Sequence, residues 1–283
     1  MSSRKVKEFV GFAILRLATF LILFALFVIL YFISIRGIRV IDWQFLTQMP
    51  SEGMTAGGIL PAILGTFYLT LCAICPALPL GIAAAIYLAE YARQGRLVRI
   101  IRIGINNLAG VPSIVFGLFG LGVFVKCFGF GVSILSGGLT LGILILPIII
   151  RASEEALLTV PQSFREASLA LGATKWQTIY RVVLPNAISG ILTGSILGIG
   201  RAAGETAPIL FTAVTFYSAR LPTSIFSEVQ ALPYHIYALM TEGTHPEAQV
   251  PIAYGTALIL LFLVLGIDLI AIIIRNRVRK KKW

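Results

Sequence analysis

Two charged side chains stand at the end of a long apolar stretch in the second half of the sequence. The run LPNAISGILTGSILGIG, residues 184–200, carries no charge, and Arg201 and Glu205 follow it four residues apart. A guanidinium offers N–H donors in a planar fork that matches the oxygens of an anion. The pattern therefore indicates contact with an anion in an apolar environment.

Three glycines precede the charges at four-residue spacing. On a helix with about 100° per residue, Gly190, Gly194 and Gly198 fall within an arc of roughly 80° that also contains Arg201 and Glu205. Glycines at this spacing let another helix approach closely. We predict that they are helix-packing residues, and that both charges face a neighbouring helix or an aqueous path and turn away from lipid.

Two roles remain open for the charged pair. In the first, Arg201 lines a translocation path, Glu205 keeps a passing anion from being trapped, and Thr206 adds a neutral donor. In the second, the two charges neutralise each other and only pack. Their order, with the cation on the N-terminal side, is the weaker one for a helical pair. A charge at the bilayer centre costs on the order of 2.5–3.5 kcal/mol on insertion scales, which favours the path role.

The whole chain has the composition of a membrane protein. Of its 283 residues, 58% are hydrophobic and 12% charged, and the mean hydropathy is +0.93. Soluble domains carry about twice that share of charge. Runs of roughly 20 apolar residues cross a bilayer as helices, because a helix satisfies its own backbone. We predict an all-α membrane protein with six transmembrane helices, near residues 13–35, 61–89, 104–126, 133–150, 185–214 and 253–274.

The polar segments between these spans divide the chain. Residues 1–60 are expected to form an N-terminal anchor helix with an external link, and residues 61–283 a transmembrane domain. This domain contains a cytoplasmic hairpin (152–184) and an external amphipathic segment (215–252) with a short helix interrupted at Pro233. Gly and Pro residues in the third span indicate that it is either broken or closely packed.

The positive charges are distributed unevenly. All but five of the 23 lysines and arginines fall on one side of the predicted spans, which includes both termini. By the positive-inside rule that side is cytoplasmic. The basic C-terminal tail is thus explained by topology, and no nucleic-acid partner is predicted. The five exceptions are Arg36, Arg39, Lys126, Arg220 and the in-span Arg201.

Residues that could do covalent or metal chemistry are sparse. His235 and His245 are the only histidines, with no cysteine or paired carboxylate at ligand spacing, so no metal site is predicted. Cys72 and Cys75 lie inside a predicted span and are interpreted as packing residues. No nucleophile–base constellation indicates a membrane enzyme, and no catalytic residue is predicted. The chain also lacks a G-x-x-x-x-G-K-[ST] phosphate loop, so any ATP must be bound by another chain.

The cytoplasmic hairpin is predicted to form two short helices around a turn, in the stretch VPQSFREASLALGATKWQTIYRVVLP (160–185). Gly172 suits a left-handed residue that closes the first helix. Thr174 with Gln177 forms a capping-box pattern that opens the second, which Pro185 would end. Both helices carry apolar stripes. These stripes either rest on the membrane interface or insert into a groove on a cytoplasmic partner.

This hairpin contains Glu166-Ala167-Ser168, then Gly172, then Val-x-Leu-Pro at 182–185. The pattern resembles the EAA loop of type I ABC-importer permeases. Ser168 replaces the second alanine of that loop, and valine replaces its isoleucine. The resemblance implies that the first helix is a coupling helix that docks onto an ATPase subunit. The residues assigned to this coupling are Phe164, Glu166, Ala167, Leu171 and Gly172.

Three further stretches are similar to one branch of these permeases. They are PLGIAAAIYLAEYA (79–92), LAGVPSIVFGLFGLG (108–122) and RAAGETAPILFTA (201–213), and they resemble the PstA family of bacterial phosphate importers. The sister PstC family carries a similar Arg-Ala-x-Gly-Glu-Thr stretch. Ala207 and Pro208 favour the PstA family. The resemblance runs from about residue 61 to the C-terminus.

This resemblance implies a subunit that binds no cofactor and catalyses no reaction. It pairs as a heterodimer with a PstC-like permease, which shares the translocation path. Two PstB-like ATPase subunits bind ATP and Mg, and an external PstS-like protein delivers phosphate. The implied location is the bacterial inner membrane. Three alternatives stay open: a permease for molybdate, sulfate or phosphonate, a member of the sister PstC family, and a secondary transporter or channel, although no inverted repeat of spans is evident.

Overall fold

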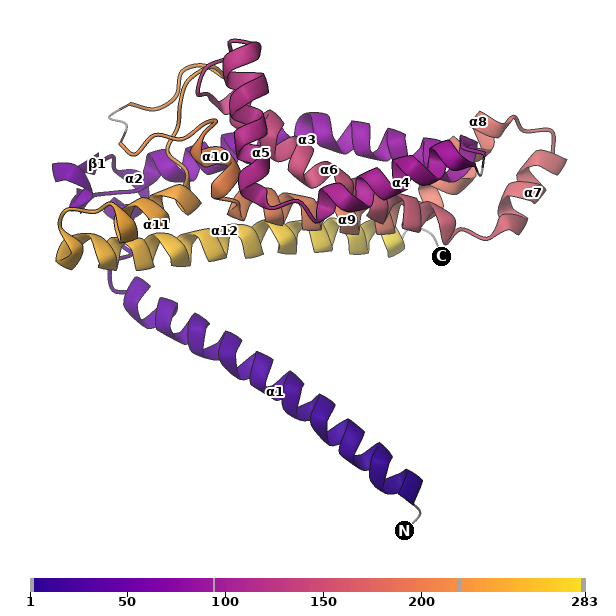
Figure 1. Ribbon diagram of the computed structural model, residues 1–283, viewed down its shortest axis with the longest axis horizontal. Coiled ribbons are helices and arrows are strands. Elements are labelled where there is room, and N and C mark those ends of the chain that lie inside the picture. Colours follow the sequence, from indigo (N-terminus) through magenta and orange to yellow (C-terminus); the bar gives the residue numbers. More distant parts are fainter. Residues whose placement is uncertain (1–2, 94, 218–219, 281–283) are drawn as a thin grey trace.

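The computed structural model describes residues 3–93, 95–217 and 220–280, with side chains placed between residues 8 and 277. Most of the chain is helical, and several of its long helices lie side by side (Figure 1). In chain order the elements are α1 (Ser3–Gly37), α2 (Trp43–Thr47), β1 (Pro50–Ser51), η1 (Glu52–Met54), β2 (Ala56–Gly57), α3 (Leu60–Ile86), η2 (Tyr87–Tyr91), α4 (Arg96–Ala109), α5 (Ser113–Gly120), η3 (Leu121–Cys127), α6 (Ile134–Leu158), α7 (Gln162–Ala170), α8 (Lys175–Thr178), η4 (Ile179–Val183), α9 (Leu184–Gly204), α10 (Ala207–Leu210), α11 (Leu232–Thr241) and α12 (Pro246–Lys280).

Within the described residues, five helical segments are long and apolar enough to cross a membrane: Glu8–Gly37, Leu60–Tyr91, Ile134–Leu158, Lys175–Gly204 and Pro246–Arg277. A sixth crossing results if the bent pair formed by α4 with α5 and η3 counts as one span. The predicted all-α membrane fold with six spans is confirmed on that count.

The third span is broken between α4 and α5, which meet at an angle of 102°. Pro112 has no N–H to continue a helical ladder, and its ring disfavours helical backbone at Val111. α4 therefore lies along the bundle, whereas α5 stands across it (Figure 1). The broken form of the prediction is confirmed. The predicted start at residue 104 is wrong, because α4 already begins at Arg96.

The fifth span ends earlier than predicted. Helix α9 stops at Gly204, and Glu205 has extended backbone with ψ of 133°. Pro208, in the short α10, cannot donate a helical hydrogen bond to Gly204, so the ladder stops here. The predicted continuation to residue 214 is therefore wrong, and Glu205 lies just beyond the helix.

The second helix of the hairpin runs without interruption into the fifth span. Between α8 and α9 the chain makes a wider π turn, in which the Leu184 N–H donates to the Ile179 carbonyl five residues back. Such a turn accommodates Pro185, which lacks an N–H. The prediction that Pro185 ends this helix is wrong. The predicted capping box of Thr174 and Gln177 and the left-handed Gly172, with φ of 84°, are confirmed.

Helix α6 is the centre of the bundle. In its most apolar window 67% of residues are buried, against 6% in α12 and none in α1. α6 packs against α3 and α9, and α12 packs against α9. Close approach depends on small residues, because Gly138 of α6 lies against Cys72 and Gly142 against the Ala73 backbone.

Helix α1 leaves the bundle at an angle (Figure 1). Its C-terminal end is held where Gly37 lies against the Tyr254 backbone of α12, where a larger residue would clash. No residue in its apolar window is buried. The apolar surface of α1 is therefore open along its length.

The segment before α12 contains one helix, and it begins later than predicted. Pro233 lies in the first turn of α11, where its missing N–H is harmless, and does not interrupt it. The described residues of the segment that precede α11 are not helical, and Val229 forms a parallel bridge with Val214. Carbonyls of Thr212, Ser227 and Ile225 accept hydrogen bonds from the N–H groups of residues 133–135, which open α6.

Candidate functional site

The two charges singled out in the sequence form an ion pair. The Arg201 Nε donates to Glu205 Oε1 at 2.9 Å, and the side chains are 40% and 16% exposed. Arg201 lies in the last turn of α9, and Glu205 is the residue that follows the helix. Among the described residues, no hydrogen bond or ion pair engages the terminal nitrogens of Arg201. They remain available to an anion.

The stripe of glycines and the charged pair do not share one surface. Gly190 lies against Ala156, Gly194 against Ala152 and Gly198 against Ile149, all in α6. Arg201 stays outside this seam, while Ala202 and Ala203 take the buried positions of the last turn. The three glycines pack against α6, whereas the Arg201 side chain is 40% exposed and Glu205 lies beyond the end of the helix.

The segment that follows the pair is wedged between other elements. Gly117 of α5 lies against the Ala207 carbonyl and Pro208 of α10, and Gly120 lies against Thr140 and Thr212. Thr206 is half-buried, and its hydroxyl has no hydrogen bond within the described part of the chain. The interruption of α9 thus meets α5, which follows the other broken helix. Discontinuous helices of this kind build substrate sites in transporters.

A second carboxylate lies close to the pair along α9. Gly200 faces Asp268 of α12, and the Asp268 Oδ1 is buried with no hydrogen-bond partner among the described residues. The sequence marks Asp268 as the one charge inside the last span, but its neighbour could not be deduced. Nearby, Arg275 donates to the Thr193 hydroxyl at 3.1 Å.

The coupling residues named from the sequence project from one end of the molecule. No residue of α7 is buried, and α7 with α8 extends beyond the ends of the long helices (Figure 1). Phe164 is 49% exposed and Leu171 89%. Glu166 and Ala167 lie exposed on the same helix, and Gly172 makes the turn after it. This exposed apolar surface has the character of a docking site.

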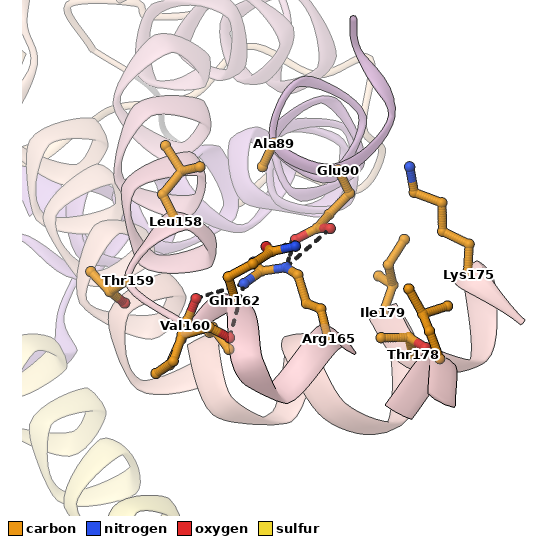
Figure 2. Close-up of a pocket in the computed structure, with 12 residues that line it drawn as sticks. Ala89, Glu90, Leu158, Thr159, Val160, Gln162, Arg165, Lys175, Thr178 and Ile179 are labelled. Carbon is orange, nitrogen blue, oxygen red and sulfur yellow. Dashed lines mark hydrogen bonds and ion pairs between the residues drawn. The ribbon is translucent and has the colours of Figure 1, made fainter. Parts of the chain in front are cut away.

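Sequence reasoning missed how this hairpin is attached. Arg165, next to Glu166, forms an ion pair with Glu90 of η2, the wider turn that continues the end of α3, with 2.7 Å between NH2 and Oε1. Figure 2 shows the guanidinium between Glu90 and the Val160 carbonyl, beside a cavity of about 590 Å³ that Lys175 borders on its far side. Both charges belong to motifs already noted, but 75 residues separate them.

No group of three or more metal-binding side chains occurs in the described ranges. His235 of α11 is buried, and this burial lowers its pKa from 6.5 to about 4. Neither ring nitrogen of His235 has a hydrogen-bond partner among the described residues. His245 is exposed and shares a hydrogen bond with the Thr244 hydroxyl.

Comparison with known proteins decides the family. Residues 77–280 match the model of the family described as "Binding-protein-dependent transport system inner membrane component". The chain belongs to this permease family. The permease is therefore a multi-pass membrane subunit of a transport complex that also contains an ATPase and a binding protein.

Relatives of the permease carry related names. It is 36% identical over 261 residues to the probable ABC transporter permease protein YqgI of Bacillus subtilis, covering 88% of each chain. It is 42% identical to the phosphate transport system permease protein PstA 1 of Mycobacterium tuberculosis, covering 78% of this chain and 71% of that one. The probable phosphate transport system permease protein PstA of Methanocaldococcus jannaschii is 35% identical, with 93% and 92% covered.

Solved structures share the fold of the permease. A bacterial alginate ABC transporter, in complex with an alginate-bound periplasmic protein, matches with a TM-score of 0.67 at 16% identity, over 94% of this chain and 93% of that one. The MetNI methionine ABC transporter in an inward-facing conformation matches with a TM-score of 0.60 at 21% identity, over 78% and 94%. These similarities establish the fold of an ABC-importer permease.

Proposed function

We propose that this permease is one of two transmembrane subunits of an ATP-driven phosphate importer and forms half of its translocation path. The observation that carries the proposal is the Arg201–Glu205 pair at the interruption of α9, in a chain whose relatives are named phosphate permeases. The pair offers free guanidinium N–H groups beside a carboxylate. Phosphate accepts hydrogen bonds from such a fork in a bidentate manner.

The residues of the pair have different roles in this mechanism. Arg201 attracts the anion and replaces part of its hydration shell. Glu205 already holds the Nε at 2.9 Å, which orients the guanidinium and reduces its net field. Thr206 supplies a hydroxyl donor. Because the anion must also leave, the attraction is kept weak by the carboxylate.

The other components of the importer are proposed on the same basis. A PstC-like permease completes the path, and a PstS-like protein delivers phosphate to the outer end. Two PstB-like subunits bind ATP and Mg, and one of them docks on the surface of α7, where Phe164 and Leu171 are exposed. The permease itself makes and breaks no covalent bond. We place both termini and the hairpin in the cytoplasm of a bacterial cell.

Uptake of radioactive phosphate into proteoliposomes tests this function. The four components are reconstituted together, and each is omitted in turn. We expect uptake only with the complete set and ATP. Excess sulfate, molybdate or phosphonate should leave uptake unchanged. Inhibition by one of these anions, or uptake without the ATPase, would assign the permease to a different transporter class.

A further inference from the structure

Arg165 connects the first helix of the hairpin to the membrane bundle by an ion pair and several hydrogen bonds. Arg165 donates from Nε and NH2 to Glu90 Oε1, at 3.1 and 2.7 Å. It also donates from NH1 to the Val160 carbonyl at 2.6 Å and from NH2 to the Leu157 carbonyl at 2.9 Å. The guanidinium thus connects α7 with the end of α3 and the end of α6 (Figure 2).

The environment of this pair makes it hard to replace. The side chains of Arg165 and Glu90 are only 12% and 8% exposed. A buried charge that loses its partner is strongly unfavourable. Leu157 lies in the last turn of α6 and Val160 follows the helix, so both carbonyls lie at a helix C-terminus, which favours a positive charge. Lysine could not serve all of these acceptors, because an ammonium lacks the planar fork.

Lys175 of α8 also lies over the Tyr91 ring at 4.9 Å, but the side-chain polar contacts of α7 itself depend on Arg165. No residue of α7 is buried. Among the described residues, every side-chain hydrogen bond or ion pair between α7 and the long helices α3 and α6 involves Arg165. The Ser168 hydroxyl bonds to Thr178 at 2.9 Å, but this contact stays within the hairpin. Besides the covalent connection to α6 through residues 159–161, this guanidinium therefore carries a displacement of α7 to α6 and to η2, which continues α3.

Helix α6 connects that point to the charged pair of the path. Along the seam with α9, Gly194 and Gly190 lie against Ala152 and Ala156. A rigid shift of α6 would thus carry α9, whose last turn holds Arg201. Packed elements of this kind transmit displacement because they cannot deform continuously.

We propose that Arg165 and Glu90 form a fixed link that makes α7, α3 and α6 move together when the ATPase displaces the hairpin. Both are positioning residues for the transport cycle. The inference rests on the proposed function, because it assumes that an ATPase drives the hairpin. The link remains closed throughout the cycle.

The coupling ratio, phosphate taken up per ATP hydrolysed, tests the link in proteoliposomes. Glu90→Gln and Arg165→Gln should each lower this ratio by about tenfold or more while ATP hydrolysis continues. Arg165→Lys should not restore it. Arg181→Gln, which removes an exposed arginine from the same hairpin, serves as the matched control and should stay within about twofold of wild type. A ratio near wild type in both glutamine variants overturns the proposal.

A spectroscopic readout separates this inference from the identity of the substrate. Spin labels at Ser163→Cys and Arg93→Cys, in assembled complex with the native cysteines replaced, report the distance between α7 and the end of α3. We expect one narrow distance distribution, with and without ATP, that broadens in Arg165→Gln and Arg165→Lys. A distribution that is equally narrow in these variants overturns the link. If the wild-type complex does not take up phosphate but the variants still show this broadening, the proposed substrate is wrong and the link stands.

Discussion

At the scale of single residues, the molecule keeps a few polar groups in surroundings that penalise them. Arg201 and Glu205 satisfy each other in part, and the exposed fraction of Arg201 leaves donors free. Asp268 and His235 have buried polar atoms with no partner among the described residues. Because unpaired buried polar groups are costly, each is a point where substitution should have a measurable consequence.

Replacement of Arg201 distinguishes a path role from mutual neutralisation. Arg201→Ala should lower phosphate uptake to about a hundredth of wild type or less, because the anion loses its charged donor. Membrane insertion and ATPase docking should remain. Uptake by reconstituted complex and co-purification with the ATPase measure the two effects. If the charges only neutralise each other, Arg201→Ala/Glu205→Ala should recover uptake, and that recovery would contradict the path role.

The stability of the permease should depend on the protonation of His235. Burial lowers its pKa to about 4, whereas the unfolded chain titrates near 6.5. Between these values the unfolded state binds more protons, so this contribution is complete above pH 6.5 and is lost as the pH falls toward 4. The loss is at most about 1.4 kcal/mol per pH unit.

Thermal unfolding of the complex in detergent, between about pH 7 and pH 5, measures this dependence. His235→Leu, which fills the site without a titrating group, should show a shallower fall of the midpoint with decreasing pH. His245→Gln removes the exposed histidine and should follow wild type. Equal slopes for wild type and His235→Leu would refute the assignment.

At the scale of elements, small residues decide which helices touch. The α6–α9 seam has glycine on one side and alanine or isoleucine on the other, so a Cβ at Gly194 would collide with the Ala152 side chain. Interiors packed at this density do not absorb extra atoms without shifting backbone. The seam therefore fixes the distance between α6, whose last turn accepts a hydrogen bond from Arg165, and α9, whose last turn holds Arg201.

Overpacking this seam should disable the permease without touching either charged pair. Gly194→Val is expected to destabilise the fold by about 1–3 kcal/mol and to reduce uptake in proportion to lost complex. Gly266→Ala in α12, where no atom lies within 4 Å of an added Cβ, is the matched control. The amount of assembled complex after purification checks the result. Normal yield and uptake for Gly194→Val would show that the seam is loose.

The same elements show what sequence patterns could predict. Hydrophobic run lengths located all six spans, and side-chain capping chemistry located the start of α8 at Thr174. Local patterns could not place the end of α9. Whether Pro208 ends the helix or is accommodated within it depends on packing against α5. Pro185 illustrates the opposite outcome, because a π turn absorbs it. The Glu90–Arg165 pair was beyond reach, since only the folded chain brings α3 and α7 together.

At the scale of the whole molecule, the two ends differ in character. The hairpin with its exposed apolar surface extends from one end, and α2, α11 and the β1–β2 hairpin cover the other (Figure 1). α1 begins and α12 ends toward the hairpin end. The charged pair lies at an interruption between these ends. In this arrangement, a displacement of the hairpin at one end can change access to the charged pair in the interior.

The orientation of the molecule follows from its charge distribution and can be measured directly. With the native cysteines replaced, Thr244→Cys lies in the exposed turn between α11 and α12, and Leu171→Cys lies at the end of α7. A membrane-impermeant maleimide is applied to cells with a permeabilised outer membrane and a sealed inner membrane. It should label Thr244→Cys and not Leu171→Cys. The second should react only after the inner membrane is permeabilised, because the positive-inside rule predicts that the richly basic side faces the cytoplasm. Labelling of Leu171→Cys in sealed cells would place the hairpin outside, where no ATPase could reach it, and would remove the basis of the ATP-driven mechanism.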